Sequence, residues 1–198
     1  MKDSLGLVVI SLLLAVTKLS AATLYVGPGG FSTIQQAVDA AAAGDRIVVT
    51  NGVYNSGGRT SPTGDDGSRV VVDKPVTLLS VNGPQFTIIQ GDKVYAWDPS
   101  GHGIRIVGPR CVSLCDGASL SGFTLANGMA YSGGGVRCTS TNAFLTNCVI
   151  RDNSAPGSTA NGNGGGAFMG TLYNCTLTGN SAAYLAAGLV MASSTTAL

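Results

Sequence analysis

Glutamate is absent from this sequence, and histidine and tryptophan occur once each, as His102 and Trp97. All 10 acidic residues are therefore Asp, and charged residues make up only 11% of the 198 residues. Any carboxylate chemistry must be done by Asp. The residues that are plentiful, among them Gly, Ser, Thr, Asn and Val, favour strands joined by tight turns over helices. The length leaves room for one domain.

Clustered positive charge is missing as well. The formal net charge of the whole chain is +1, and the few Lys and Arg residues are spread along it. Proteins that bind nucleic acids need grouped Lys and Arg to contact phosphates. We therefore expect no nucleic acid partner.

The first 22 residues have the pattern of a secretory signal peptide. Lys2 supplies a positive start, and the apolar run at 5–16 is shorter than the roughly 20 residues that span a bilayer. Ser20 and Ala22 place small residues before a cleavage site. We predict export, to the extracellular space, the cell surface or an outer membrane, with a mature domain at 23–198. No later segment is apolar enough to span a membrane.

The five cysteines fit no zinc or redox motif. Cys111 and Cys115 are close enough in sequence to close a small loop, and an exported chain could oxidise them. The alternative, which we prefer, is that most of the cysteines are small buried apolar groups.

One amphipathic helix is predicted over 32–43. Ser32 and Gln35 have the spacing of a capping box, the apolar residues that follow recur at helical intervals, and Gly44 stands where a helix C-terminus favours glycine. Short apolar runs bounded by turn residues come next, at 46–49, 70–72, 76–79, 86–89 and 103–107. These runs predict strands, and no second helix is expected.

An internal repeat decides the fold prediction. The segment 145–155 recurs at 172–182 with a shift of 27 residues, and a looser copy stands at 120–127. A second motif of Gly-Gly-apolar type alternates with the first, at 133–136, 164–167 and 187–190. Each unit therefore carries two or three short strands and two turn clusters.

A coil of this size cannot bury its own apolar side chains, but stacked coils can, with their strands paired in parallel. The sequence thus predicts a right-handed parallel β-helix, all-β, with one N-terminal capping helix. In register, Leu145 stacks on Leu172 and Ile150 on Leu177.

The repeated asparagines, Asn147 with Asn174 and Asn153 with Asn180, are predicted to form amide ladders at the turn corners. For Asn174 we prefer this role to glycosylation of the sequon that it begins. Cys148 and Cys175 are predicted to form a stack of thiols and not a disulfide, because the spacing of stacked coils is slightly beyond the usual Cβ separation for a disulfide.

The helix IQQAVDAAAAGDRIVV followed by NGVY resembles the beginning of pectin-lyase-like right-handed β-helix proteins. The later NCVIRDNSA and NCTLTGNSA units are similar to those of bacterial cell-surface β-helix proteins and, loosely, to polymorphic outer-membrane protein repeats. In the latter, Phe stands where Ile150 and Leu177 stand here. The resemblance implies a fold that hosts lyases, hydrolases, esterases, adhesins and passengers alike.

Candidate catalytic residues are few. Asp65 and Asp66 form a carboxylate pair in a Gly-, Ser- and Thr-rich loop, and a Gly-His-Gly turn at His102 precedes Arg105. The resemblance implies Asp, His and Arg as the groups that act on acidic glycans. The alternatives are a solvated turn for the Asp pair, a turn residue for His102 and a solvated strand residue for Arg105.

Binding candidates surround these residues. Tyr95 and Trp97 could stack on a sugar ring, and the alternative for Trp97 is a local packing anchor. Asp92 and Asp98 are candidate ligands for Ca²⁺, with turn capping as the alternative. No motif requires a cofactor.

The predicted function is a secreted or surface β-helix of adhesin or passenger type that binds glycans or partner proteins. The alternative is a polysaccharide lyase or glycoside hydrolase acting on acidic polysaccharides such as pectin. Residues 185–198 begin a coil without a recognisable cap, so we expect further coils beyond Leu198.

Overall fold

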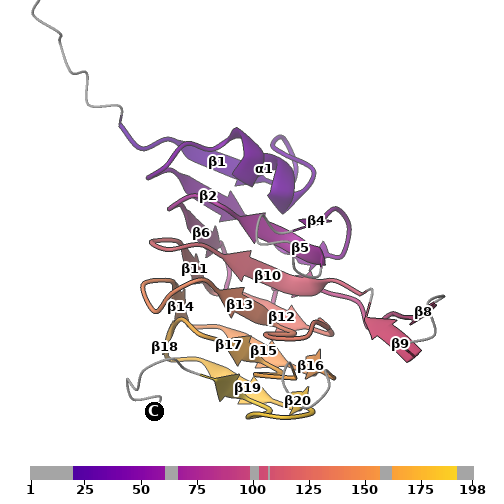
Figure 1. Cartoon of the computed structure of the whole chain (residues 1–198). Helices are drawn as coiled ribbons and strands as arrows, with labels where there is room; N and C mark the ends of the chain where they lie inside the picture. The colour runs from indigo at the N-terminus through magenta and orange to yellow at the C-terminus, as the bar shows by residue number, and fades with distance from the viewer. Residues whose placement is uncertain (1–19, 61–66, 99–102, 107, 157–161, 191–198) are drawn as a thin grey trace, which may run out of the picture.

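The computed structural model describes residues 20–60, 67–98, 103–106, 108–156 and 162–190. Most strands belong to three sheets that run along the length of a coiled stack (Figure 1). Sheet A contains, in spatial order, β1 (Thr23–Val26), β2 (Arg46–Val49), β6 (Thr77–Ser80), β11 (Ser119–Ser121), β14 (Phe144–Thr146) and β18 (Thr171–Tyr173).

The other two large sheets complete each coil. Sheet B contains β3 (Gly52–Tyr54), β7 (Thr87–Gln90), β12 (Thr124–Ala126), β15 (Val149–Arg151) and β19 (Thr176–Thr178). Sheet C contains β4 (Arg59–Thr60), β5 (Gly67–Val72), β10 (Arg110–Leu114), β13 (Val136–Cys138), β17 (Ala167–Phe168) and β21 (Leu189–Val190). Within these three sheets, every pair of described strands is parallel except β4 with β5. The strands thus form the predicted parallel β-helix.

The interior of the stack is filled by columns of apolar side chains from equivalent positions. In sheet A the inward column is Leu24, Ile47, Leu78, Leu120, Leu145 and Leu172. In sheet B, Ile150 pairs with Leu177. These pairs confirm the predicted register of the repeat. The register is strictly determined, because a shift of one residue would turn every apolar side chain outward.

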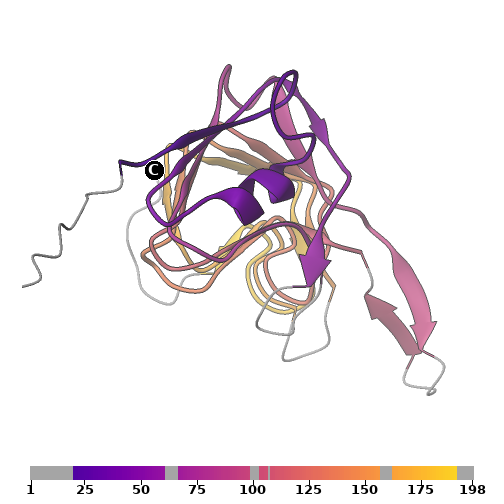
Figure 2. The same cartoon turned by 90° about the horizontal axis from the view of Figure 1, so that it is seen from above.

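The helix α1 (Ile34–Ala40) lies across one end of the stack, over the interior of the first coil (Figure 2). Its residues Ile34, Ala37 and Val38 are buried on the side that faces the interior of the stack. The helix therefore caps the stack, as predicted.

The ends of α1 differ from the prediction. Thr33 is the N-cap, and Gln36 closes the capping box. Gln35 is unavailable for capping because its side chain bonds both backbone groups of Val71 in β5. The helix ends at Ala40, short of 43, because its C-cap Ala41 turns to extended backbone and Asp45 accepts the next N–H, from Ala42.

The last Gly-Gly-apolar motif is shifted by one residue from the prediction. Leu189, not Val190, pairs with Ala167, which in turn pairs with Val136. Leu189 packs against the core. An inward apolar side chain at the end of the motif thus decides the register of this coil.

Both asparagine ladders are confirmed. Asn174 Nδ2 donates to Asn147 Oδ1 at 2.6 Å, and Asn153 Nδ2 donates to Asn180 Oδ1 at 3.0 Å. Asn147 and Asn174 have φ angles of 53° and 50°, so they also form the corners between sheets A and B. Two further short strands, β16 (Ser154–Ala155) and β20 (Ser181–Ala182), pair in parallel beyond the buried ladder.

The apolar run at 103–107 behaves differently from the others. Residues 103–106 form β9 (Gly103–Ile106), which pairs antiparallel with β8 (Tyr95–Asp98). This hairpin projects from the side of the stack (Figures 1 and 2). Among the described residues, no helix is both long and apolar enough to cross a membrane.

Candidate functional site

Of the four predicted catalytic residues, one lies among the residues that the structure describes. Asp65, Asp66 and His102 lie outside the described residues, and Arg105 belongs to β9, where its backbone pairs with that of Ala96. The catalytic prediction for these four residues therefore stays a prediction.

The predicted binding residues lie on or beside the same hairpin. Trp97 and Asp98 are in β8, and their backbones pair with Ile104 and Gly103. Tyr95 is 53% exposed, so its side chain is available for contact. Asp92 is exposed before β8. No three His, Cys, Asp or Glu residues gather into a metal site among the residues that the structure describes.

The two candidate catalytic segments leave the stack from neighbouring coils. The β4–β5 connection spans 61–66, and β5 pairs with β10, Ser68 opposite Arg110. The hairpin is rooted just before β10, where Asp92 N donates to Pro109 O at 3.2 Å. We call the side of the stack that carries β4, the start of β5 and the β8–β9 hairpin the hairpin edge.

The described charges near the hairpin edge are largely engaged with one another. Arg59 Nη1 lies 3.1 Å from Asp39 Oδ1, and Arg59 Nη2 lies 2.5 Å from Asp73 Oδ2. Arg59 thus ties β4 to α1 and to the end of β5. This cluster is consistent with a structural role.

A second candidate surface is the outer side of sheet A, which we call the A face. Its outward side chains form two columns along the stack. One column is Thr23, Arg46, Thr77, Ser119, Phe144 and Thr171, and the other is Tyr25, Val48, Leu79, Ser121, Thr146 and Tyr173.

Three aromatic side chains stand out on the A face. Tyr25 is 58% exposed, Phe144 43% and Tyr173 73%. Tyr25 is on the first strand of the sheet, and Phe144 and Tyr173 are on the last two. Five strand-to-strand steps of roughly 4.8 Å separate the two tyrosines by about 24 Å. The aromatic groups therefore bracket a long, flat surface.

Between the aromatic groups the A face is rich in hydroxyls and poor in charge. Thr77, Ser119 and Thr146 are half-buried there, and Ser119 Oγ donates to Thr77 Oγ1 at 3.1 Å. Arg46 is the one charged residue in the two columns. The surface offers hydrogen-bonding groups and aromatic rings without a strong electric field.

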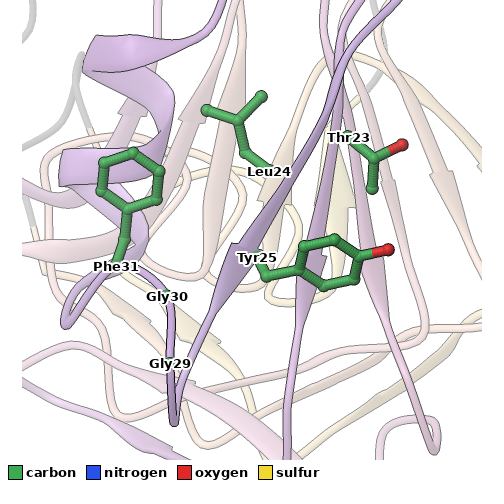
Figure 3. Close-up of a pocket in the computed structure, with 6 residues that line it drawn as sticks. All are labelled: Thr23, Leu24, Tyr25, Gly29, Gly30 and Phe31. Atoms are coloured by element: carbon green, nitrogen blue, oxygen red, sulfur yellow. The ribbon is translucent and has the colours of Figure 1, made fainter.

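A hollow of about 510 Å³ lies at the Tyr25 end. It is lined by Thr23, Leu24, Tyr25, Gly29, Gly30 and Phe31 (Figure 3). Tyr25 and Thr23 extend from one side of β1, whereas Leu24 and Phe31 lie toward α1 (Figure 3). A Cβ at Gly30 would lie 2.2 Å from Tyr25 O, so the tight turn below Tyr25 requires glycine.

Reasoning from sequence missed the A face, although a signal was present. The tripeptide Thr-Leu-Tyr occurs at 23–25 and again at 171–173, at the two ends of sheet A. In each copy the middle Leu packs against the core. Strand alternation then places Thr and Tyr outward on the same face.

No protein-family model and no curated protein matches the chain. A solved structure of a pectin methylesterase mutant in complex with hexasaccharide IV is 14% identical, with a TM-score of 0.49, over 82% of this chain and 50% of that one. Pectin methylesterase from carrot is 18% identical, with a TM-score of 0.44, over 83% of this chain and 53% of that one.

This chain thus spans about half the length of these solved structures. Likeness at this level carries no information about activity. The strand order and parallel register of the chain itself are those of a parallel β-helix. The function must be argued from the residues on its surface.

Proposed function

We propose that this β-helix binds polysaccharide along the A face. The observation that carries the proposal is the placement of exposed Tyr25, Phe144 and Tyr173 at the two ends of one hydroxyl-rich strand surface. A sugar ring has apolar C–H faces and a rim of hydroxyls. An exposed aromatic ring can pack against the C–H face of the sugar, and Ser and Thr side chains can form hydrogen bonds with its hydroxyls.

The shape and charge of the A face favour an extended, weakly charged ligand. Aromatic groups about 24 Å apart can contact one chain of several sugars, and contacts at both ends act together. With Arg46 as its one charge, the face suits a neutral glycan or an esterified acidic one better than a polyanion. Adhesin or passenger type, with export directed by the first 22 residues, is part of this proposal.

Binding to a panel of purified polysaccharides tests the proposal. Esterified pectin, polygalacturonate, xylan and cellulose cover the charged and uncharged cases. Tyr173→Ala and Tyr25→Ala should each weaken binding by about tenfold, as expected for the loss of an aromatic contact that carries much of the binding energy. Isothermal titration calorimetry measures the soluble ligands, and sedimentation measures the insoluble ones.

Tyr184→Ala is the matched control. Tyr184 is 56% exposed but follows β20, away from sheet A. Its substitution should leave binding unchanged. If Tyr184→Ala weakens binding as much as Tyr173→Ala, or if neither A-face variant has an effect, the A face is not the binding surface.

Catalysis at the hairpin edge is the second candidate function. It is supported by the pairing of Ser68 with Arg110 on neighbouring coils. Ser68 follows Asp65 and Asp66 closely in sequence, and Arg110 follows His102 and Arg105. A lyase or glycoside hydrolase acting on acidic polysaccharides such as pectin would need Asp groups for proton transfer and an Arg for the sugar carboxylate. Ca²⁺ held by Asp92 and Asp98 would belong to the same candidate site.

Product assays separate the two functions. Hydrolysis releases reducing ends, and a lyase forms an unsaturated product that absorbs ultraviolet light. Replacement of Asp65, Asp66 and Arg105 by Ala should abolish such turnover while circular dichroism shows the fold intact. If the wild-type protein produces neither product from any polysaccharide that it binds, the catalytic candidate is rejected and the binding function stands alone.

A further inference from the structure

Two cysteines occupy the same position in successive coils. Cys148 precedes β15 and Cys175 precedes β19, and the next residues, Val149 and Thr176, are paired in register. The backbone bond from Thr176 N to Cys148 O, at 2.9 Å, holds the two coils together at this point. Adjacent strands lie about 4.8 Å apart, within the Cα separation that a disulfide accepts.

The two thiols have the same orientation. Cys148 Sγ lies 3.3 Å from Thr146 O and 3.7 Å from Leu120 O, in the preceding coil. Cys175 Sγ makes the equivalent contacts, at 3.4 Å to Tyr173 O and 3.5 Å to Leu145 O. The Cys175 sulfur therefore points toward the coil that carries Cys148.

The pair is asymmetric in exposure. Cys148 is buried, at 1% exposed, whereas Cys175 is half-buried and reachable from solvent. Cys111 and Cys138 are both fully buried. Of the five cysteines, Cys115 and Cys175 are the two that a reagent can reach in the folded protein.

The pair is also asymmetric in acidity. The hydrogen bond from Cys148 lowers the pKa of Cys175 to about 7. The same hydrogen bond, together with burial, raises the pKa of Cys148 well above its ordinary value. Burial raises the pKa of Cys115 as well. Cys175 thus supplies an accessible thiolate, the reactive form of cysteine, while Cys115 stays protonated.

We propose that Cys175 and Cys148 form a modification site for low-molecular-weight disulfides, in which Cys175 attacks and Cys148 resolves. The Cys175 thiolate attacks one sulfur of the small disulfide, whose S–S bond breaks and releases one thiolate. Cys148 then gives up its proton and attacks the Cys175 sulfur, which displaces the second thiolate. The two protein thiols are oxidised to a disulfide between coils, and the small disulfide is reduced to two thiols.

The product would fasten the last described coils of the stack. Leu172 and Leu177, in the coil of Cys175, are only half-buried, whereas Leu145 and Ile150, in the coil of Cys148, are fully buried. A bond between the two coils therefore secures the less buried one. Reduction by a small thiol would release it again.

Peptide mapping of the full chain tests the proposal. The reduced protein is incubated with oxidised glutathione, remaining thiols are alkylated, and peptides are identified by mass spectrometry. A Cys148–Cys175 linked peptide is expected, with Cys111 and Cys138 alkylated only after unfolding. The proposal is overturned if both thiols stay reduced, if glutathione remains on Cys175, or if Cys115 reacts faster than Cys175.

Variants assign the two roles. In Cys148→Ser, glutathione should stay attached to Cys175, because no thiol is left to displace it. Cys175→Ser should leave Cys148 unmodified. Cys115→Ser should not change the rate at which the Cys148–Cys175 bridge forms. Where Cys148→Ser does not fold, the wild-type time course decides. Glutathione must appear on Cys175 before the bridge forms, and its appearance on Cys148 contradicts the assigned roles.

Discussion

At the scale of single residues, the contribution of a ladder asparagine to the free energy of unfolding depends on how deeply its side chain is buried. Asn153 is 0% exposed, and its side chain donates to Leu125 O at 3.0 Å and accepts from Gly128 N at 2.8 Å. Asn174 is exposed and makes one ladder bond. The same residue type in two different ladders thus makes two different contributions to stability.

Asn153→Ala should lower the free energy of unfolding by about 3 kcal/mol, because it leaves buried partners unsatisfied at roughly 1–3 kcal/mol each. Urea unfolding followed by circular dichroism measures the loss. Asn174→Gly is the control. It removes the exposed ladder bond without straining the positive φ, so its effect should stay below about 1 kcal/mol. Equal losses in the two variants would contradict the assignment to burial.

The buried thiols predict a loss of stability in alkali. Burial raises the pKa of Cys111 and Cys138 from 9.0 to about 12. Above pH 9.0 the unfolded chain releases protons that the folded chain keeps, so stability falls with rising pH until about 12. Each thiol adds a slope of about 1.4 kcal/mol per pH unit in this window.

Cys138→Ala isolates one of these slopes. Urea unfolding across the window should show a pH dependence that is shallower by about 1.4 kcal/mol per unit than in the wild type. Below pH 9.0 the two slopes should agree, whatever stability the cavity left by the smaller side chain costs. A slope unchanged above pH 9.0 would show that Cys138 does not retain its proton.

At the scale of elements, α1 is held to the stack by a side chain that imitates strand pairing. Gln35 is only 8% exposed, and its Oε1 accepts from Val71 N at 2.7 Å while its Nε2 donates to Val71 O at 3.1 Å. The amide thereby satisfies two backbone groups of β5 that face α1.

Gln35→Ala should destabilise the protein by about 2–4 kcal/mol, since both backbone groups of Val71 lose their partners. Hydrogen exchange should speed up at the Val71 amide. Gln36→Ala is the matched control: it removes the bond from Thr33 N to the Gln36 side chain, which is worth about 1 kcal/mol, and leaves the Val71 amide protected. Fast exchange at Val71 in both variants would show that fraying of the helix, and not loss of Gln35, is the cause.

The elements also show how far local sequence determines structure. Leu145 and Leu172 were predicted to pair because a repeat in sequence becomes a stack in space. Which of Gln35 and Gln36 closes the capping box could not be predicted, because the choice depends on Val71, 36 residues away. The run at 103–106 has the same apolar pattern as the strands of the coils. It forms a hairpin because it pairs with β8, and the local sequence does not indicate this pairing.

At the scale of the whole molecule, the predictions from sequence singled out reactive residue types and did not identify the A face. Asp92, Tyr95 and Arg105 drew attention because Asp, Tyr and Arg carry chemistry. Tyr25 and Tyr173 are 148 residues apart in sequence, and only the repeated Thr-Leu-Tyr tripeptide connects them. They share a face only because the intervening chain passes through four more strands of sheet A.

The salt dependence of binding distinguishes the two surfaces of the molecule. On the A face Arg46 is the one charge, so the dissociation constant of a bound polysaccharide should change by less than about twofold when salt is raised from about 0.05 M to 0.5 M. Arg46→Ala should weaken binding by less than Tyr173→Ala at every salt concentration. Affinity that falls steeply with salt, as measured by titration calorimetry, would instead indicate an acidic polysaccharide held by charged side chains. The hairpin edge, with Lys93 and Arg105 in its sequence, would then be the surface to examine.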